Sequence, residues 1–292
     1  MRRIGTIILL GLSCGGLLLA QRPGRGGNRG GDWGEGGWIG EDVRTPREVP
    51  SHSTGTPDWT NAPGFEKDVF TFVRIRRQRA PASRGGSWST DTPDSDLNLS
   101  YRLQQLTSLK VDPNGRFLRL TDKELFDYPF IYMVEPGSLL LDEEEVAVLG
   151  KYLRNGGFLW LDDFWGEREW ADMAEVLKRV LPECSFVELP LSDPLYHCVF
   201  DIQSKGQVPN VGLGIQSEFD PEHRTWERPD AREVHHRGLY DAKGRLMVLA
   251  THNTDNGDGW EREGESDYFF HKFSENISYP LAINVIFYVM TH

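Results

Sequence analysis

Two adjacent aspartates, Asp162 and Asp163, are the residues whose type and position best suit chemistry. They follow residues 158–161, a short apolar run that is typical of a buried strand. In a parallel sheet, ligands gather at the carboxyl ends of the strands. If both carboxylates faced one crevice, their repulsion would raise the pKa of one and prepare an acid–base pair or a cation site. Alternatively, a carboxylate at a strand end caps the next segment and is only structural.

Two histidines could join these aspartates. His252 follows the apolar residues 245–250, and His197 opens another strand-like segment, residues 197–202. Imidazole and carboxylate groups together can bind a divalent metal, but no close spacing such as His-x-x-x-His supports such a site. The sequence therefore assigns no metal ligand and no cofactor. Local hydrogen bonds are the alternative role for both imidazoles.

Two further regions could contact a ligand. Trp260 stands in a Gly- and Asp-rich segment, residues 255–268, which we expect to be a loop that does not fit the register of a calcium-binding loop. Its indole could stack on a ligand or anchor the loop by burial. The second region is cationic and aromatic, and suits an anionic or carbohydrate ligand unless it is a solvated insertion. Its members are His223, Arg224, Trp226, Arg228, His235, His236 and Arg237.

The elements that must position these residues alternate between strands and helices. Continuous apolar runs predict buried strands, and helical periodicity predicts amphipathic helices between them. This alternation predicts an α/β fold, a doubly wound and mainly parallel sheet in a single domain over residues 65–292. The expected strands are residues 69–75, 117–120, 130–134, 158–161 and 245–250, with residues 185–189 and 197–202 as further candidates. The expected helices are residues 96–107, 142–155, 169–181 and 281–290.

The N-terminal part of the chain has a different texture. Residues 1–20 combine Arg2 and Arg3 with an apolar run, which is typical of a secretory signal peptide; an uncleaved anchor is the alternative. Residues 21–64 are Gly/Arg-rich and then Pro/Ser-rich, which predicts a disordered linker. We therefore expect an exported protein, periplasmic or extracellular, with no transmembrane span in the mature chain.

Charge excludes one class of partner. Removing residues 1–20 takes away two arginines and no acid, which leaves 30 basic against 44 acidic residues, a net charge of −14. Such a chain repels phosphate backbones, so no nucleic acid partner is expected.

Cys184 and Cys198 remain in the chain after the signal peptide is removed, and the sequence does not decide between a disulfide and two buried thiols.

The chain also resembles the DUF4159 family over residues 66–290. The resemblance is carried by short motifs whose order and spacing match: Asp96-Leu97-Asn98-Leu99, Tyr128-Pro129-Phe130, Gly156-Gly157-Phe158, Asp162-Asp163 and Asn284. It implies an exported bacterial protein with a flavodoxin-like sheet similar to class I glutamine amidotransferases. It implies no established activity.

The amidotransferase pattern is incomplete here. Those enzymes carry a nucleophilic cysteine on a sharp strand-to-helix turn, and this chain has Asp162 and Asp163 in the comparable place, with no cysteine nearby. We therefore expect a non-catalytic domain that binds an unknown ligand, such as a glycan or a protein of the cell envelope, or acts as a scaffold. The alternative is an envelope hydrolase in which Asp163 is the base or nucleophile, Asp162 orients it and His252 carries the proton.

Overall fold

A seven-stranded sheet organises the computed structural model, which describes residues 39–53, 55–64, 68–77 and 87–292. The strand order is β2-β1-β3-β4-β7-β6-β5. The first five strands in this order are parallel, and β6 and β5 add an antiparallel edge. The strands are β1 (Val73–Ile75), β2 (Arg116–Leu118), β3 (Phe130–Val134), β4 (Phe158–Asp162), β5 (Val187–Glu188), β6 (His235–Tyr240) and β7 (Leu246–His252). The expectation of an α/β domain with a mainly parallel sheet is confirmed.

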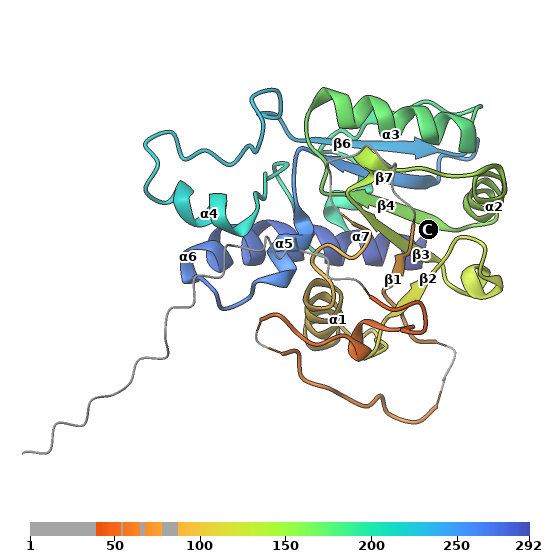
Figure 1. The fold of residues 1–292 in the computed structure, drawn as a ribbon, viewed down its shortest axis with the longest axis horizontal. Coiled ribbons are helices and arrows are strands. Elements are labelled where there is room, and N and C mark those ends of the chain that lie inside the picture. Colours follow the sequence, from red (N-terminus) through yellow and green to blue (C-terminus); the bar gives the residue numbers. More distant parts are fainter. Residues whose placement is uncertain (1–38, 54, 65–67, 78–86) are drawn as a thin grey trace, which may run out of the picture. The chain divides into compact units, whose positions relative to one another are not determined.

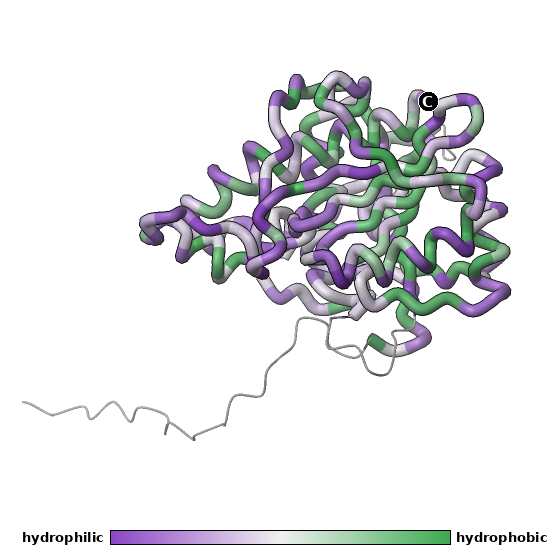
Figure 2. Tube along the Cα trace, turned by 90° about the horizontal axis from the view of Figure 1, so that it is seen from above, coloured by the Kyte–Doolittle hydropathy of each residue, from purple (hydrophilic) through white to green (hydrophobic). Residues whose placement is uncertain are grey.

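The centre of the sheet is buried on both faces. Every residue of β3, β4 and β7 is buried, which explains why these strands are apolar runs without polar alternation. β3 pairs with β4 in the register Phe130↔Phe158 to Val134↔Asp162. Figure 2 shows hydrophobic stretches running through the interior of the domain.

Helices cover both faces of the sheet (Figure 1). On one face, α1 (Asp94–Leu106) and α7 (Tyr279–Thr291) pack on the core that contains Phe72, Tyr132 and Trp160. On the other face, α2 (Glu143–Arg154) and α3 (Gly166–Val180) pack on the core that contains Ile131 and Leu159. The short helices are α4 (Val211–Ser217), α5 (Asn256–Glu261) and α6 (Asp267–Phe269), with the π-helix η5 (Phe270–Ser278) and the 3-10 helices η1 (Pro46–Glu48), η2 (Lys123–Asp127), η3 (Pro136–Ser138) and η4 (Pro194–His197).

Local signals explain the boundaries of α2. The Asp142 side chain accepts a hydrogen bond from the Glu145 nitrogen, and the Glu145 side chain accepts one from the Asp142 nitrogen, so a capping box starts the helix. Gly156 follows the helix with a φ of 107°, a backbone conformation that side chains with a Cβ disfavour. Both features agree with the sequence.

Three segments differ from the expected elements. Residues 255–268 contain α5 and the start of α6 rather than one loop, and residues 197–202 lie in η4 and a loop instead of a strand. β6 lies within residues that show no clear period in the sequence. It escapes detection because its sequence, His-His-Arg-Gly-Leu-Tyr, has neither a continuous apolar run nor a regular alternation of apolar and polar residues.

The described part of the segment expected to be a linker, residues 39–53 and 55–64, contacts the domain. Arg47 donates a hydrogen bond to the Pro113 carbonyl at 2.7 Å, and the Trp59 indole donates one to the Val111 carbonyl at 2.9 Å. The expected signal peptide, residues 1–20, and residues 21–38 lie outside the described residues.

No helix in the described part of the chain combines the length and apolar character needed to cross a bilayer.

Cys184 and Cys198 are not bonded to each other. Each thiol instead donates a hydrogen bond to a backbone carbonyl, Cys184 to Tyr240 and Cys198 to Pro194.

Candidate acidic site at the carboxyl edge of the sheet

Asp162 ends β4 and is fully buried on the face of the sheet covered by α1 and α7. Its carboxylate accepts hydrogen bonds from Tyr132 Oη at 3.0 Å, Thr251 Oγ1 at 2.5 Å, and Asn256 through N at 3.0 Å and Nδ2 at 2.8 Å. Burial still raises the pKa of Asp162, although these donors act in the opposite direction. Asp162 therefore joins β3, β4, β7 and the start of α5.

Asp163 has different neighbours. Its Oδ1 accepts a hydrogen bond from Trp165 Nε1 at 2.9 Å, and its backbone has a φ of 55°. Burial, followed by the negative charges of Glu135 and Glu227, raises the pKa of Asp163 well above its ordinary value. The two adjacent aspartates thus have separate hydrogen-bond partners and separate structural settings.

A second group of carboxylates comes from two distant parts of the chain. Asp91 precedes α1, and Asp255 and Asp258 belong to the start of α5. One carboxylate oxygen from each lies within 4.8 Å of the others, and all three residues are buried. We call these three residues the aspartate cluster.

Local structure fixes the two members on α5. Asp255 is the N-cap, and its Oδ1 accepts a hydrogen bond from Asp258 N at 2.9 Å. Asp258 Oδ2 accepts one from Val211 N, the first residue of α4, at 2.6 Å. Neighbouring contacts hold α5 in place, since Asn256 bonds Asp162 and the Asn98 side chain donates to the Trp260 carbonyl at 2.8 Å.

Asp91 is the least satisfied member of the cluster. It is 2% exposed and has a φ of 63°, and neither carboxylate oxygen has a hydrogen-bond partner among the described residues. Its Oδ2 lies so close to Gly257 that a Cβ there would approach it to 2.2 Å, which explains the glycine. A buried carboxylate without a partner carries a large desolvation cost.

The electrostatics of the cluster are unfavourable without a counter-charge. Burial, then Asp258 and Glu261, raises the pKa of Asp91 well above its ordinary value. Burial, then Asp163 and Asp258, does the same for Asp255. Protons or a cation can relieve this repulsion.

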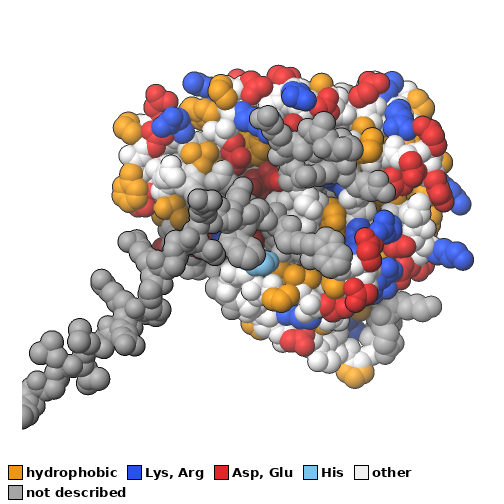
Figure 3. All heavy atoms as spheres, in the orientation of Figure 1, with side chains coloured by type: hydrophobic (Ala, Val, Ile, Leu, Met, Phe, Trp, Pro, Cys, Tyr) orange, Lys and Arg blue, Asp and Glu red, His pale blue; other side chains and the backbone are white. Residues whose placement is uncertain are grey.

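The donor set fits a hard divalent cation. Because oxygen ligands lie about 2.0–2.6 Å from Mg²⁺ or Ca²⁺, two ligands of one ion are at most roughly 5 Å apart, which the cluster satisfies. All three donors are carboxylate oxygens, which suit Mg²⁺, Ca²⁺ or Mn²⁺. Each aspartate of the cluster is at most 4% exposed. On the face shown in Figure 3, the coloured acidic and basic side chains are interspersed.

His252 lies at the end of β7, with partners outside the cluster. Its Nε2 contacts the Gly166 carbonyl at 3.0 Å and its Nδ1 contacts Arg237 Nη1 at 3.2 Å, so Nε2 carries the proton and Nδ1 accepts. The ring stacks on Phe164 at 4.9 Å, and burial lowers the pKa of His252 to about 4. Neither contact is to a carboxylate, and the Asp163–His252 pair of the hydrolase hypothesis is not among the described contacts.

His197 and Arg224 lie on the surface in local ion pairs. His197 contacts Asp201 at 2.6 Å and the Leu191 carbonyl at 2.8 Å, and these contacts, the carbonyl first, raise the pKa of His197. Arg224 donates to Asp220 at 2.5 Å. Neither side chain is brought to the aspartate cluster by these contacts.

Trp260 anchors α5 by burial. The indole is fully buried against the rings of Phe72, Tyr132 and Trp160, with centroid distances of 6.5, 5.9 and 5.4 Å. In this conformation the ring is part of the core. This is the anchoring role that the sequence left open beside ligand stacking.

Two ion pairs connect α1 to other parts of the chain. Arg74 and Asp96 are both fully buried, and Arg74 Nε lies 2.9 Å from Asp96 Oδ1. Arg102 pairs with Glu263 at 2.7 Å. The Arg74–Asp96 pair joins β1 to α1, and it thereby fixes the start of the helix that Asp91 precedes.

Sequence reasoning selected Asp162 and Asp163 but missed all three members of the cluster, Asp91, Asp255 and Asp258. Asp255 and Asp258 occur in the Gly/Asp-rich segment that does not fit a calcium-loop register. One signal was available: this segment follows a buried strand, at the edge of the sheet where ligands bind in α/β folds.

Comparison with known proteins places the chain in a family. No curated protein matches it. The model of DUF4159, a domain of unknown function, matches residues 71–290, which include β1 to β7 and all three aspartates of the cluster. The chain belongs to the DUF4159 family.

Proposed function

We propose that this protein is an exported binding domain whose aspartate cluster, Asp91, Asp255 and Asp258, holds a divalent cation. The observation that carries the proposal is the buried carboxylate of Asp91, which has no hydrogen-bond partner among the described residues and lies beside two more carboxylates. Arg74 acts to lower the pKa of Asp91, yet that pKa remains well above its ordinary value, and a bound cation would supply further positive charge.

The cation would act first on structure. Asp91 belongs to the connection between β1 and α1, while Asp255 and Asp258 belong to α5. An ion bound by all three would hold these two segments together at the carboxyl edge of the sheet. An ion with a free coordination position would also accept an oxygen of a ligand, such as a hydroxyl or carboxylate of an envelope glycan or protein.

Two finer expectations belong to the same proposal. The order β2-β1-β3-β4 agrees with the start of a flavodoxin-like sheet, which supports the similarity to class I glutamine amidotransferases. Residues 1–20 support export to the periplasm or the extracellular space.

A hydrolase of the cell envelope is the second candidate. It is favoured by the raised pKa of Asp163, because a carboxyl with a raised pKa keeps its proton to a higher pH and can act as a general acid. Because His252 has no carboxylate partner among the described contacts, Asp163 would act as the acid, and a water bound to the cation would be the nucleophile.

Cation binding is tested with the full chain after treatment with EDTA. We expect Ca²⁺, Mg²⁺ or Mn²⁺ to bind in titration calorimetry and to raise the melting temperature. Asp91→Asn and Asp258→Asn should lose this effect, and asparagine tolerates the positive φ of Asp91. The control is Asp172→Asn, whose exposed side chain lies on α3.

Two results would refute the cation site: no stabilisation by any of the three ions, or an equal rise in melting temperature in Asp91→Asn and the wild type.

The hydrolase is tested separately by mass spectrometry of peptidoglycan fragments incubated with the full chain. Cleavage that disappears in Asp163→Asn and in EDTA would support it, and intact fragments would count against it.

A further inference from the structure

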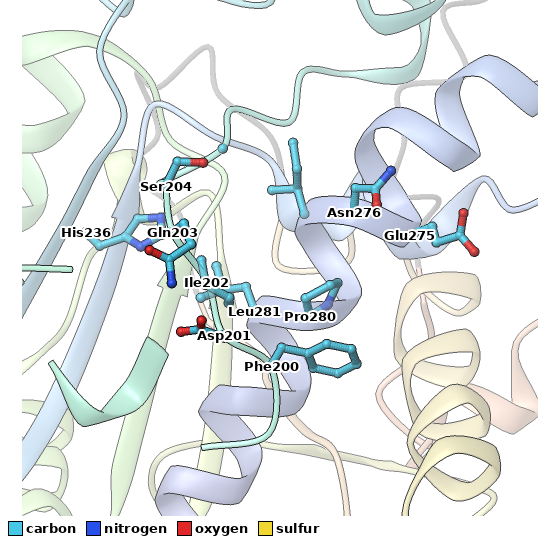
Figure 4. A pocket seen from close by; sticks show the side chains of 12 residues that line it. Phe200, Asp201, Ile202, Gln203, Ser204, His236, Glu275, Asn276, Pro280 and Leu281 are labelled. Atoms are coloured by element: carbon cyan, nitrogen blue, oxygen red, sulfur yellow. The ribbon is translucent and has the colours of Figure 1, made fainter. Parts of the chain in front are cut away.

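A cavity of about 390 Å³ lies between the loop after η4, strand β6 and the π-helix η5 (Figure 4). None of the aspartate cluster lines it, and its size is within the range of small-molecule sites. The lining combines apolar side chains with several amide, hydroxyl and imidazole groups: Phe200, Ile202, Gln203, Ser204, His236, Asn276, Ile277, Pro280 and Leu281 are among them.

The backbone at the mouth of this cavity is fixed by Asn284. This fully buried residue of α7 accepts hydrogen bonds from Val199 N at 3.1 Å and Phe200 N at 2.8 Å, and donates one to the Phe200 carbonyl at 2.8 Å. The Phe200 side chain nevertheless remains 38% exposed. An exposed aromatic side chain on a fixed backbone is suited to stacking on a ligand, because little conformational entropy is lost on binding.

The imidazole that lines the cavity is incompletely satisfied. His236 is 2% exposed, and its Nδ1 bonds the Tyr196 hydroxyl at 2.9 Å. Its Nε2 is buried without a hydrogen-bond partner among the described residues. Burial lowers the pKa of His236 to about 3, so the ring is neutral at physiological pH. A hydroxyl can donate or accept, so it would pair with Nε2 in either tautomer.

The third wall is a π-helix, η5, which contributes Asn276 and Ile277. Helices of this type are rare and occur frequently at functional sites. Asn276 donates its amide to the His271 carbonyl, which leaves its side-chain oxygen as an acceptor for a ligand. Gln203 and Ser204 face the same space from the loop after η4 (Figure 4).

Charge at the rim restricts the ligand. Asp201 and Glu275 line the cavity and are paired with His197 and His271 at the surface. No Lys or Arg is among the residues that line it. A negatively charged ligand would therefore meet two carboxylates without a basic group inside the cavity to bind it.

We propose that this cavity binds a neutral saccharide of one or two rings. The apolar face of a sugar ring would pack on Phe200 and Pro280, and its hydroxyls would pair with Ser204, Asn276 and His236. This site is separate from the aspartate cluster and does not depend on the cation. Binding should therefore be the same in the presence of Ca²⁺ and of EDTA.

The test is saturation-transfer NMR and titration calorimetry on the full chain. The probes are N-acetylglucosamine, diacetylchitobiose and maltose, with glucuronate as an anionic comparison. We expect at least one neutral sugar to bind and glucuronate to bind more weakly. Phe200→Ala should weaken binding roughly tenfold, as expected for the loss of an aromatic contact.

The matched control is Phe219→Ala, which removes an aromatic ring that is 79% exposed and does not line the cavity. It should bind like the wild type. Asn276→Ala, at an exposed helix position, is a second variant that should weaken binding without unfolding the domain. The proposal fails if none of the three neutral probes binds, if Phe200→Ala binds as the wild type does, or if glucuronate binds best.

Discussion

Asn256 donates two hydrogen bonds to the carboxylate of Asp162, from its backbone nitrogen at 3.0 Å and from Nδ2 at 2.8 Å. This contact joins the first residue of α5 to the last residue of β4. Because Asp255 and Asp258 belong to the same turn, the position of the aspartate cluster depends on Asp162. Asp162 is thus a positioning residue for the cluster.

The first prediction concerns this link. Asp162→Asn should lower the free energy of unfolding by about 2–4 kcal/mol, because an amide cannot accept from all four donors that now meet the carboxylate. It should also weaken Ca²⁺ binding by loosening α5. Urea denaturation measures the first effect and titration calorimetry the second, with Asp172→Asn as control. An Asp162→Asn variant as stable as the wild type would contradict this role.

The second prediction is a pH dependence of the cation-free protein. The raised pKa values of Asp91 and Asp255 mean that the folded state binds more protons than the unfolded state once the pH exceeds about 4. The contribution of the cluster to the free energy of unfolding should therefore fall as the pH rises above that value. Urea denaturation in EDTA, across mildly acidic to neutral pH, measures it.

Asp91→Asn should make that fall shallower, and saturating Ca²⁺ should offset it in the wild type. Asp172→Asn should keep the wild-type slope. If Asp91→Asn and the wild type gave parallel curves in EDTA, the repulsion assigned to the cluster would be absent.

Local patterns were sufficient to predict much of the fold. Residues 130–134 form β3 with the expected bounds, and the pairing of Asp142 with Glu145 starts α2 as expected. In both cases the signal lies within a few residues: an apolar run that needs two covered faces, or a cap that satisfies free backbone amides. The antiparallel edge carries weaker signals, because β6 is partly exposed and interrupted by Gly238.

The aspartate cluster could not be predicted in this way. Asp91 reaches α5 only because Asn98 and Asp162 hold that helix against α1 and the sheet. Such contacts join residues that are far apart in the sequence, and no local spacing encodes them. Asp162 and Asp163 were identifiable because they directly follow a buried strand, but their separate hydrogen-bond partners depend on tertiary structure.

The third prediction concerns His252, whose pKa is lowered to about 4 by burial. A lowered histidine pKa means that the neutral ring is favoured by folding, so its contribution to stability is present above pH 6.5 and is lost as the pH falls toward 4. At about 1.4 kcal/mol per pH unit, the loss reaches at most about 3 kcal/mol. Denaturation curves at pH 7 and pH 4.5 measure it.

His252→Gln should show a smaller loss between these two pH values than the wild type. The difference between the two proteins isolates His252 from the aspartate cluster, whose contribution has the opposite sign. His271→Gln, at an exposed position, is the control and should follow the wild type. Equal losses in His252→Gln and the wild type would show that another group titrates.

The fourth prediction concerns the buried pair Arg74–Asp96. Arg74 Nε lies 2.9 Å from Asp96 Oδ1, and Arg74 also donates to the Thr90 carbonyl and to Ser95 Oγ, at 2.9 Å each. Arg74→Met would leave the Asp96 carboxylate buried without its counter-charge. The free energy of unfolding should therefore fall by about 3–5 kcal/mol. The same change would release Thr90, the neighbour of Asp91, and Ca²⁺ affinity should fall as well.

Arg168→Met is the control for this pair, because Arg168 and Asp172 are exposed and 3.8 Å apart, and such pairs contribute about 0–1 kcal/mol. The double variant Arg74→Met/Asp96→Asn separates two causes of the loss. If the uncompensated charge dominates, the double variant should be more stable than Arg74→Met alone, since the buried carboxylate is gone. If it is less stable, the hydrogen bonds of Asp96 within α1 matter more than its charge, and the electrostatic explanation is wrong.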